Sequence, residues 1–225
     1  MTENKFQALK YMWQDAGMSD PMMFSICFYE KPELIIRLFE LFYPNLQIEE
    51  LIGKPQSPAQ FLHNCRTEPQ IFMLAKTKEG DIVRIELCLT ESLAGHFFFD
   101  GEYNDYLPRI QSDEISHCYN IMISTELGED CGRPIIQVGI KSNHVFQYDL
   151  TGTLICLSDH GEITNEDVRQ FLELMRGEEP EGEFVKAFLE VLHHVKYETD
   201  WMDFYIEETL YKEMLLYKQN IDRRS

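Results

Sequence analysis

One carboxylate, Glu86, lies in a pair of apolar-rich runs whose neighbouring residues decide what chemistry it can do. The runs flank a polar segment at 78–80 that ends in glycine, and a glycine late in a short turn is typical of a β-hairpin. If these three residues form the loop, with the glycine in the left-handed conformation, Thr77 pairs with Asp81. The same register places Phe72 opposite Glu86. Glu86 is then the one carboxylate in the middle of its face of the hairpin.

Period-two alternation of side chains divides this hairpin into two faces. One face is entirely apolar and is expected to lie on a dry core: Ile71, Met73, Ala75, Val83, Ile85, Leu87 and Leu89. The other face is mixed: Gln70, Phe72, Leu74 and Lys76 on the first strand, and Arg84, Glu86 and Cys88 on the second. We expect Glu86 to be partly desolvated, which raises its pKa unless Arg84 or another cation compensates.

This arrangement resembles the metal-site hairpin of the PD-(D/E)XK nuclease superfamily, and in particular the bacterial PD-(D/E)XK nuclease family transposases, also called recombination-promoting nucleases. In that family the first strand carries an Asp, a turn with a Gly follows, and the second strand carries Glu-x-Gln or Glu-x-Lys. The segment 85–88 stands where the family has Ile-Glu-Met-Gln. The resemblance implies an Asp at position 72 and a Gln or Lys at position 88. This chain has Phe72 and Cys88 there, so Glu86 is retained and its two partners are replaced.

The resemblance extends over residues 19–205 and depends on the order of segments as well as on the hairpin. It includes Ser19–Phe24, a helix that begins at Glu33, and the turn Gly132-Arg133-Pro134. Glu40 on that helix matches an acidic residue that approaches the metal site in such nucleases. A surface glutamate three residues after Arg37 fits the same helix equally well. Both interpretations of Glu40 remain open at the level of sequence.

The pattern of elements predicts an α/β fold, with a mixed central β-sheet, flanking helices, C-terminal helices and, as the resemblance implies, a restriction-endonuclease-like core. Helices are expected near 4–16, over 22–28, from 34 to 42, after the cap at Thr164, over 184–195 and over 199–220. Strands are expected at the hairpin, over 115–123, and near 135–140, 144–149 and 153–157. We assign residues 1–180 to a nuclease-like domain and residues 181–225 to a helical extension. The extension is apolar enough to pack on this domain or on a second subunit.

Composition restricts the class of protein further. The formal charge is -19, and this acidic balance argues against DNA binding, because a protein that binds a phosphate backbone usually has a surplus of Lys and Arg. The six cysteines contain no Cys-x-x-Cys pair, so we expect reduced thiols and neither a disulfide framework nor a zinc site. No apolar run approaches a membrane span, and no signal-peptide pattern opens the chain, which favours a cytoplasmic location.

These observations favour a catalytically impaired member of the family that acts as a binding or regulatory protein. Phe72 offers no metal ligand, and the soft thiol of Cys88 suits Mg²⁺ poorly, so no cofactor is expected. The alternative is a divergent Mg²⁺-dependent DNA endonuclease in which Glu86 and Glu40 hold the ion. A third interpretation is an unrelated acidic α/β interaction protein. The expected partner is an unidentified protein, or a second copy bound through the C-terminal helices.

Adjacent His193 and His194 point about 100° apart on a helix and are not expected to chelate one metal.

Overall fold

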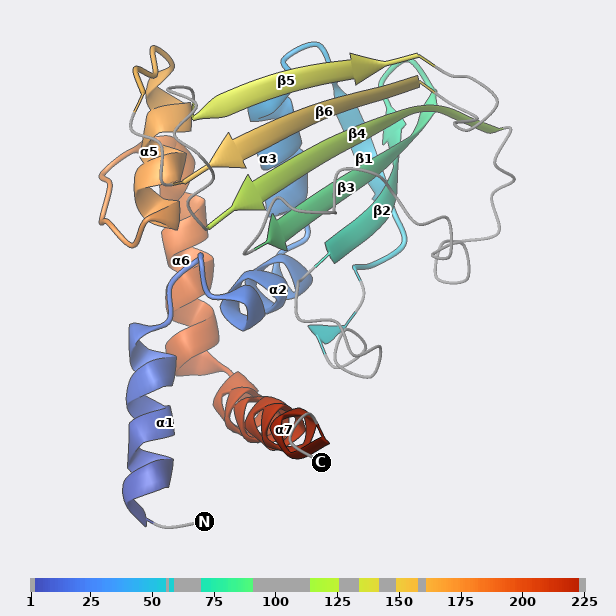
Figure 1. Ribbon diagram of the computed structural model, residues 1–225. Coiled ribbons are helices and arrows are strands. Elements are labelled where there is room, and N and C mark those ends of the chain that lie inside the picture. Colours follow the sequence, from blue (N-terminus) through green and yellow to red (C-terminus); the bar gives the residue numbers. More distant parts are fainter. Residues whose placement is uncertain are drawn as a thin grey trace.

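The computed structural model describes residues 3–55, 57–58, 70–90, 114–125, 134–141, 149–157 and 161–222, and in these it is a mixed α/β protein. Figure 1 shows one open sheet with α3 behind it, α5 and α6 at one end, and α1 and α7 extending away from it. The elements in chain order are α1 (Glu3–Asp15), α2 (Pro21–Glu30), α3 (Glu33–Phe42), β1 (Ile48–Ile52), β2 (Gln70–Thr77), β3 (Ile82–Thr90), β4 (Ile115–Ser124), β5 (Ile135–Ile140), β6 (Asp149–Cys156), α5 (Glu166–Met175), α6 (Glu183–Glu198) and α7 (Trp201–Asp222).

The sheet has six strands in the order β1-β2-β3-β4-β6-β5. An antiparallel meander, β1-β2-β3, is extended by β4 and β6, which run parallel to β3, and β5 closes the edge antiparallel to β6. The predicted mixed sheet with flanking helices is therefore confirmed. β3 lies in the interior of this sheet, and residues 83–90 of it are all buried, as expected for a strand covered on both faces.

α2 and α5 each begin where a short polar side chain accepts the free backbone N–H groups of the first turn. Asp20 Oδ1 accepts hydrogen bonds from the backbone N–H of Met22 (3.0 Å) and of Met23 (2.9 Å), as its place before Pro21 predicts. At α5 the capping residue is Asn165, one residue after the predicted Thr164, and its side chain accepts from the N–H of Val168 at 3.2 Å.

The main core lies between the apolar face of the hairpin and the helices. Phe188 of α6 links three helices within it, with its ring centroid 6.2 Å from that of Phe28 of α2 and 5.7 Å from that of Phe171 of α5. All three rings are fully buried. Side chains of α6 and Tyr205 of α7 belong to this same core, so α6 and the first part of α7 pack on the body of the chain. No helix in the described segments is long and apolar enough to cross a membrane.

Two strands differ in extent or presence from the expectation of the sequence. β1 was not predicted, because Glu49 and Glu50 interrupt its apolar pattern; both carboxylates are exposed on an edge strand. The strand expected near 153–157 is present as part of β6, which begins earlier, at Asp149; the strand expected near 144–149 falls largely on residues 142–148, which lie outside the described part of the chain. Gly152 does not end β6, since it is held between β4 and β5 on both sides.

Candidate functional site

The turn of the β2–β3 hairpin has the geometry that its sequence predicts. Gly80 is left-handed, with φ of 92°, and its N–H donates to the carbonyl oxygen of Thr77 at 3.0 Å. The N–H of Thr77 donates to the carbonyl oxygen of Asp81 at 2.9 Å. This turn fixes the register, in which Phe72 lies directly opposite Glu86. The predicted pairing is confirmed.

The two faces of the hairpin also divide as predicted, but the mixed face is more deeply buried than the sequence suggests. The seven apolar side chains of the core face are each exposed by 3% or less. On the other face Glu86 is 2% exposed, and its neighbours along β3, Arg84 and Cys88, are 6% and 4% exposed. Glu86 is therefore wholly desolvated rather than partly so.

The buried carboxylate of Glu86 is surrounded by groups that neutralise it. Arg84 Nε forms an ion pair with Glu86 Oε1, and Asn120 Nδ2 of β4 donates to Oε2 at 3.4 Å. The Cys118 side chain, also on β4, forms a further hydrogen bond with the carboxylate. The guanidinium of Arg84 lies 5.3 Å from the ring centroid of Phe72, a cation–π distance. We call Glu86, Arg84, Phe72, Asn120 and Cys118 the Glu86 cluster.

Burial and charge act in opposite directions on Glu86. Burial raises the pKa of Glu86 to about 7, and this effect exceeds the opposing effects of Arg84 and of the hydrogen bonds from Asn120 and Cys118. Burial, together with the negative charge of Glu86, raises the pKa of the Cys118 thiol. The predicted upward shift of the Glu86 pKa is confirmed. The charged form of this carboxyl therefore depends on Arg84.

The Glu86 cluster does not have the composition of a Mg²⁺ site. Such a site needs several oxygen ligands and usually retains water on the metal. The cluster offers one carboxylate, closed from solvent, and an arginine already supplies the compensating positive charge. Among the residues that the structure describes, no group of three or more His, Cys, Asp and Glu side chains could hold a metal ion.

Glu40, the second candidate ligand, lies apart from this cluster. Its Oε1 accepts a hydrogen bond from the backbone N–H of Ile48 at 3.2 Å, so the carboxylate holds the start of β1. Ile48 is opposite Thr77. Thr77 is five residues along β2 from Phe72, or roughly 16 Å at the rise of a β-strand. The α3 side chains also pack against the apolar face of the hairpin, whereas Glu86 is on the other face. The structure therefore does not bring Glu40 and Glu86 together.

Cys88, at the position where the resemblance implies Gln or Lys, lies on the same face of the hairpin as Glu86 and is buried. Asn120 and Cys118 were not identified from the sequence. Ile121 and Ile123 are fully buried in the main core, so alternation along β4 places Asn120 and Cys118 on the opposite face of the sheet. Only the parallel pairing of β4 with β3, which brings Asn120 opposite Glu86, could have identified them.

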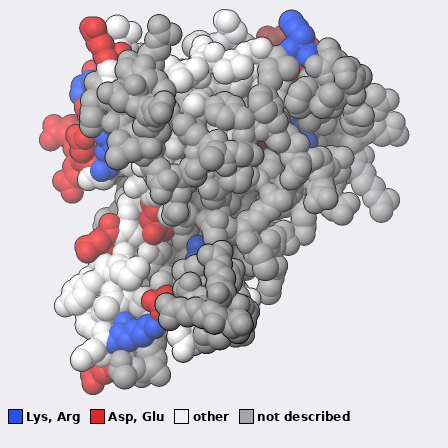
Figure 2. All heavy atoms as spheres, in the orientation of Figure 1, with Lys and Arg blue, Asp and Glu red and all other residues white. Residues whose placement is uncertain are grey.

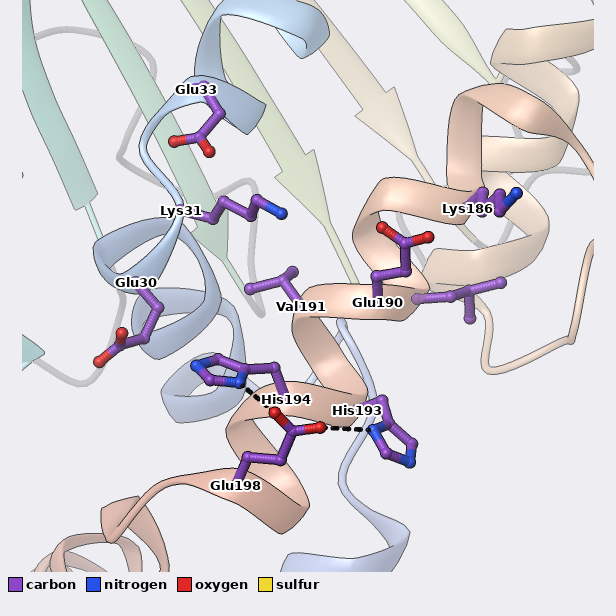
Figure 3. Close-up of a pocket in the computed structure, with 10 residues that line it drawn as sticks. Glu30, Lys31, Glu33, Lys186, Glu190, Val191, His193, His194 and Glu198 are labelled. Carbon is purple, nitrogen blue, oxygen red and sulfur yellow. Dashed lines mark hydrogen bonds and ion pairs between the residues drawn. The ribbon is translucent and has the colours of Figure 1, made fainter.

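A second feature is an open groove of about 680 Å³ between the α2–α3 junction and α6 (Figure 3). Its lining includes four glutamates, two lysines and two histidines: Glu30, Glu33, Glu190, Glu198, Lys31, Lys186, His193 and His194. Figure 3 shows Glu198 between the two imidazoles, with His194 Nδ1 at 3.0 Å and His193 Nδ1 at 3.7 Å from different oxygens of that carboxylate. The groove mixes both signs of charge, and its histidines contact one glutamate rather than converge on open space.

Acidic side chains gather on one part of the described surface. Figure 2 shows Asp and Glu side chains gathered over the α5 end of the molecule, with Lys and Arg side chains between them. Several of these charges are paired within α5, where Arg169 forms ion pairs with Glu166 and Glu173. These exposed pairs contribute little to stability. The described surface at this end presents no uniformly basic face.

Comparison with known proteins gives no relative: no family model, no curated protein and no solved structure matches the chain.

Proposed function

We propose that this chain has the core of a PD-(D/E)XK nuclease of the transposase family, that it has lost metal-dependent cleavage, and that it acts as a binding or regulatory protein. The resemblance in the hairpin and in the order of segments motivates the lineage. The Glu86 cluster motivates the loss.

The topology supports the lineage. The resemblance implies a mixed sheet built around the metal-site hairpin, with flanking helices. Here α3 precedes the meander β1-β2-β3, and β4 and β6 continue the sheet in parallel. Glu86 occupies the middle of the second hairpin strand, as the resemblance implies.

The proposed loss of activity is supported by one observation, the burial and ion pairing of the Glu86 carboxylate. It is 2% exposed, faces Phe72 where the family has its Asp, and is ion-paired with Arg84. Cleavage of a phosphodiester by this family needs a metal ion that polarises the phosphate and activates water. A carboxylate neutralised by a buried guanidinium has no free charge with which to attract that ion. The formal charge of -19 further opposes approach of a nucleic acid.

The experiment is a cleavage assay on single-stranded and double-stranded DNA in Mg²⁺ and in Mn²⁺. The natural sequence is compared with Glu86→Ala and with a restored triple variant, Phe72→Asp, Arg84→Ser and Cys88→Lys. The restored variant removes the guanidinium and supplies the missing carboxylate and lysine. Circular dichroism shows that each variant is folded.

The natural sequence is expected not to cut. Cleavage by the restored variant alone supports both the lineage and the loss. Cleavage by the natural sequence that disappears in Glu86→Ala would instead identify an active Mg²⁺-dependent endonuclease, and it would overturn the proposal.

A further inference from the structure

The described sheet has two edge strands, β1 and β5, and they are built differently. On β1 the carboxylates of Glu49 and Glu50 are exposed, and the register with β2 shifts between Ile48 and Glu50. Charged side chains and irregular pairing are common means by which proteins prevent another strand from adding to an edge. β5 contains no charged residue and no proline, and its register with β6 is regular throughout. The β5 edge therefore lacks both protections.

The outer side of β5 presents backbone hydrogen-bonding groups. The N–H of Cys156 donates to the carbonyl oxygen of Pro134 at 2.8 Å, so the backbone of residue 134 faces β6. Backbone groups alternate in direction along an antiparallel strand. The N–H and C=O groups of Ile135, Gln137 and Gly139 consequently face away from β6. No other described strand pairs with this side, and Figure 1 shows β5 as the outermost strand.

This edge is open, and a side chain holds it in place. Gln137, Val138 and Gly139 are all exposed, and an added Cβ at Gly139 meets no atom of the described part of the chain within 4 Å. The Nε2 of Gln137 donates to the carbonyl oxygen of Phe42, the last residue of α3, at 3.2 Å. The outward backbone groups therefore belong to a strand that is already fixed on both its inner side and one face.

The two faces of β5 offer different side chains to a neighbouring strand. Val138 is 38% exposed, and alternation places it on the same face as Ile136. Ile136 packs against the small apolar cluster of Met122, Leu154 and Cys156. On the other face the exposed side chain is the amide of Gln137. A strand beside β5 would find an apolar neighbour on one face and a polar neighbour on the other.

We propose that β5 binds an extended segment of another protein, which adds to the sheet as a further strand. Strand addition supplies partners for the outward N–H and C=O groups of three residues, and the alternating side chains of the segment give specificity. The segment carries an apolar side chain beside Val138 and a polar one beside Gln137, because neighbours on one face of a sheet interact directly.

Charge decides between the possible occupants. The chain has 39 acidic and 20 basic residues, so an uncharged or basic segment is attracted and an acidic one is repelled. A second copy of the chain would bring a further formal charge of -19 to the same edge, which opposes pairing of β5 with β5. The occupant is therefore an uncharged or basic segment of a different protein. This inference does not depend on the proposed nuclease lineage.

The test uses a fluorescein-labelled peptide in which valine alternates with threonine, with one arginine at each end. Its binding to the full chain is followed by fluorescence anisotropy, and saturable binding is expected. A peptide of the same sequence and charge, N-methylated at its three central amides, should not bind saturably, because it lacks the backbone donors that strand addition needs.

Two substitutions at one residue test the site. Gly139→Pro removes an outward N–H and no bond to β6, so it should weaken peptide binding by roughly tenfold. Gly139→Ala is the matched control, because it keeps the N–H and its Cβ enters open space; it should bind like the natural protein. Val138→Lys keeps every backbone group and should also weaken binding, since a lysine on an edge opposes strand addition. Circular dichroism of each variant is expected to match that of the natural protein.

Amide hydrogen exchange locates the bound peptide. Without peptide the N–H groups of Gln137 and Gly139 should exchange quickly and that of Val138 slowly, and the peptide should slow the first two. Absence of saturable binding at 1 mM peptide would overturn the proposal, as would binding that Gly139→Pro and Val138→Lys both leave unchanged. Dimerisation of the natural protein in sedimentation velocity that Gly139→Pro abolishes would also overturn it, because a second copy would then occupy the edge.

Discussion

Replacing Glu86 with glutamine should change how the stability of this protein depends on pH. The substitution preserves the shape of the side chain and an oxygen acceptor for Asn120, but it removes the titrating group. Burial raises the pKa of Glu86 to about 7 in the folded protein, against 4.5 for an ordinary exposed glutamate. At a pH between these two pKa values, Glu86 binds more protons in the folded state than in the unfolded state. The contribution of Glu86 to stability is therefore full below pH 4.5 and is lost as pH rises through 7.

The size of this effect follows from the difference between the two pKa values. A difference of about 2.5 pH units corresponds to about 3 kcal/mol, at about 1.4 kcal/mol for each unit. No reduction for solvent screening is needed, because Glu86 is 2% exposed. The sequence pI is 4.7, so solubility restricts the experiment to pH 5.5 and above. Between pH 5.5 and 8, about 2 kcal/mol of the effect is accessible.

Urea unfolding of the two proteins at pH 5.5, 6.5, 7.5 and 8, followed by the fluorescence of Trp13 and Trp201, measures this difference. The natural protein should lose about 2 kcal/mol more than Glu86→Gln between the ends of that range. The remaining carboxylates titrate in both proteins, so their effect cancels in the comparison. Parallel stability curves for the two proteins would refute the reasoning, because they would mean that Glu86 titrates alike in the folded and unfolded states.

Three further predictions concern the same architecture. Arg84→Met leaves the Glu86 carboxylate buried without its counter-charge and should cost about 3 to 5 kcal/mol at pH 8, with a smaller loss at pH 5.5, in the same urea assay. Phe188→Ala removes a fully buried ring of the main core and should cost about 3 to 5 kcal/mol; a loss below about 1 kcal/mol would contradict the packing described here. Gly80→Ala forces a side chain into a left-handed turn and should cost about 1 to 2 kcal/mol. Gly17→Ala, where an added Cβ meets nothing within 4 Å and the backbone is not left-handed, should be nearly neutral.

The hairpin could be predicted from the sequence because its information is local. A late glycine sets the turn, period-two alternation sets the faces, and together they place Phe72 opposite Glu86. The helices were predictable for the same reason, since Asp20 supplies a cap and Pro44 lies just beyond the end of α3.

The rest of the Glu86 cluster depends on pairing between strands far apart in the chain. Asn120 reaches Glu86 only because β4 adds to β3 in parallel, and no local pattern encodes that neighbour. The position of Glu40 was likewise undecided by sequence. Its helix could have turned the carboxylate either way, and only the hydrogen bond to Ile48 places it at the start of β1. β1 itself, with two glutamates in five residues, lacks the pattern of a strand and is held by its pairing with β2.

The central claim, that Arg84 rather than a metal ion neutralises Glu86, is tested most directly by titrating the protein with Mn²⁺ and measuring free Mn²⁺ by electron paramagnetic resonance. The free Mn²⁺ signal should be the same with the natural protein as with Glu86→Gln, because position 86 offers an ionised carboxylate without a counter-charge in neither protein. A variant with Phe72→Asp and Arg84→Ser, which pairs two carboxylates across the hairpin and removes the guanidinium, should lower that signal. Saturable binding of one Mn²⁺ per chain by the natural protein that disappears in Glu86→Gln would contradict the account.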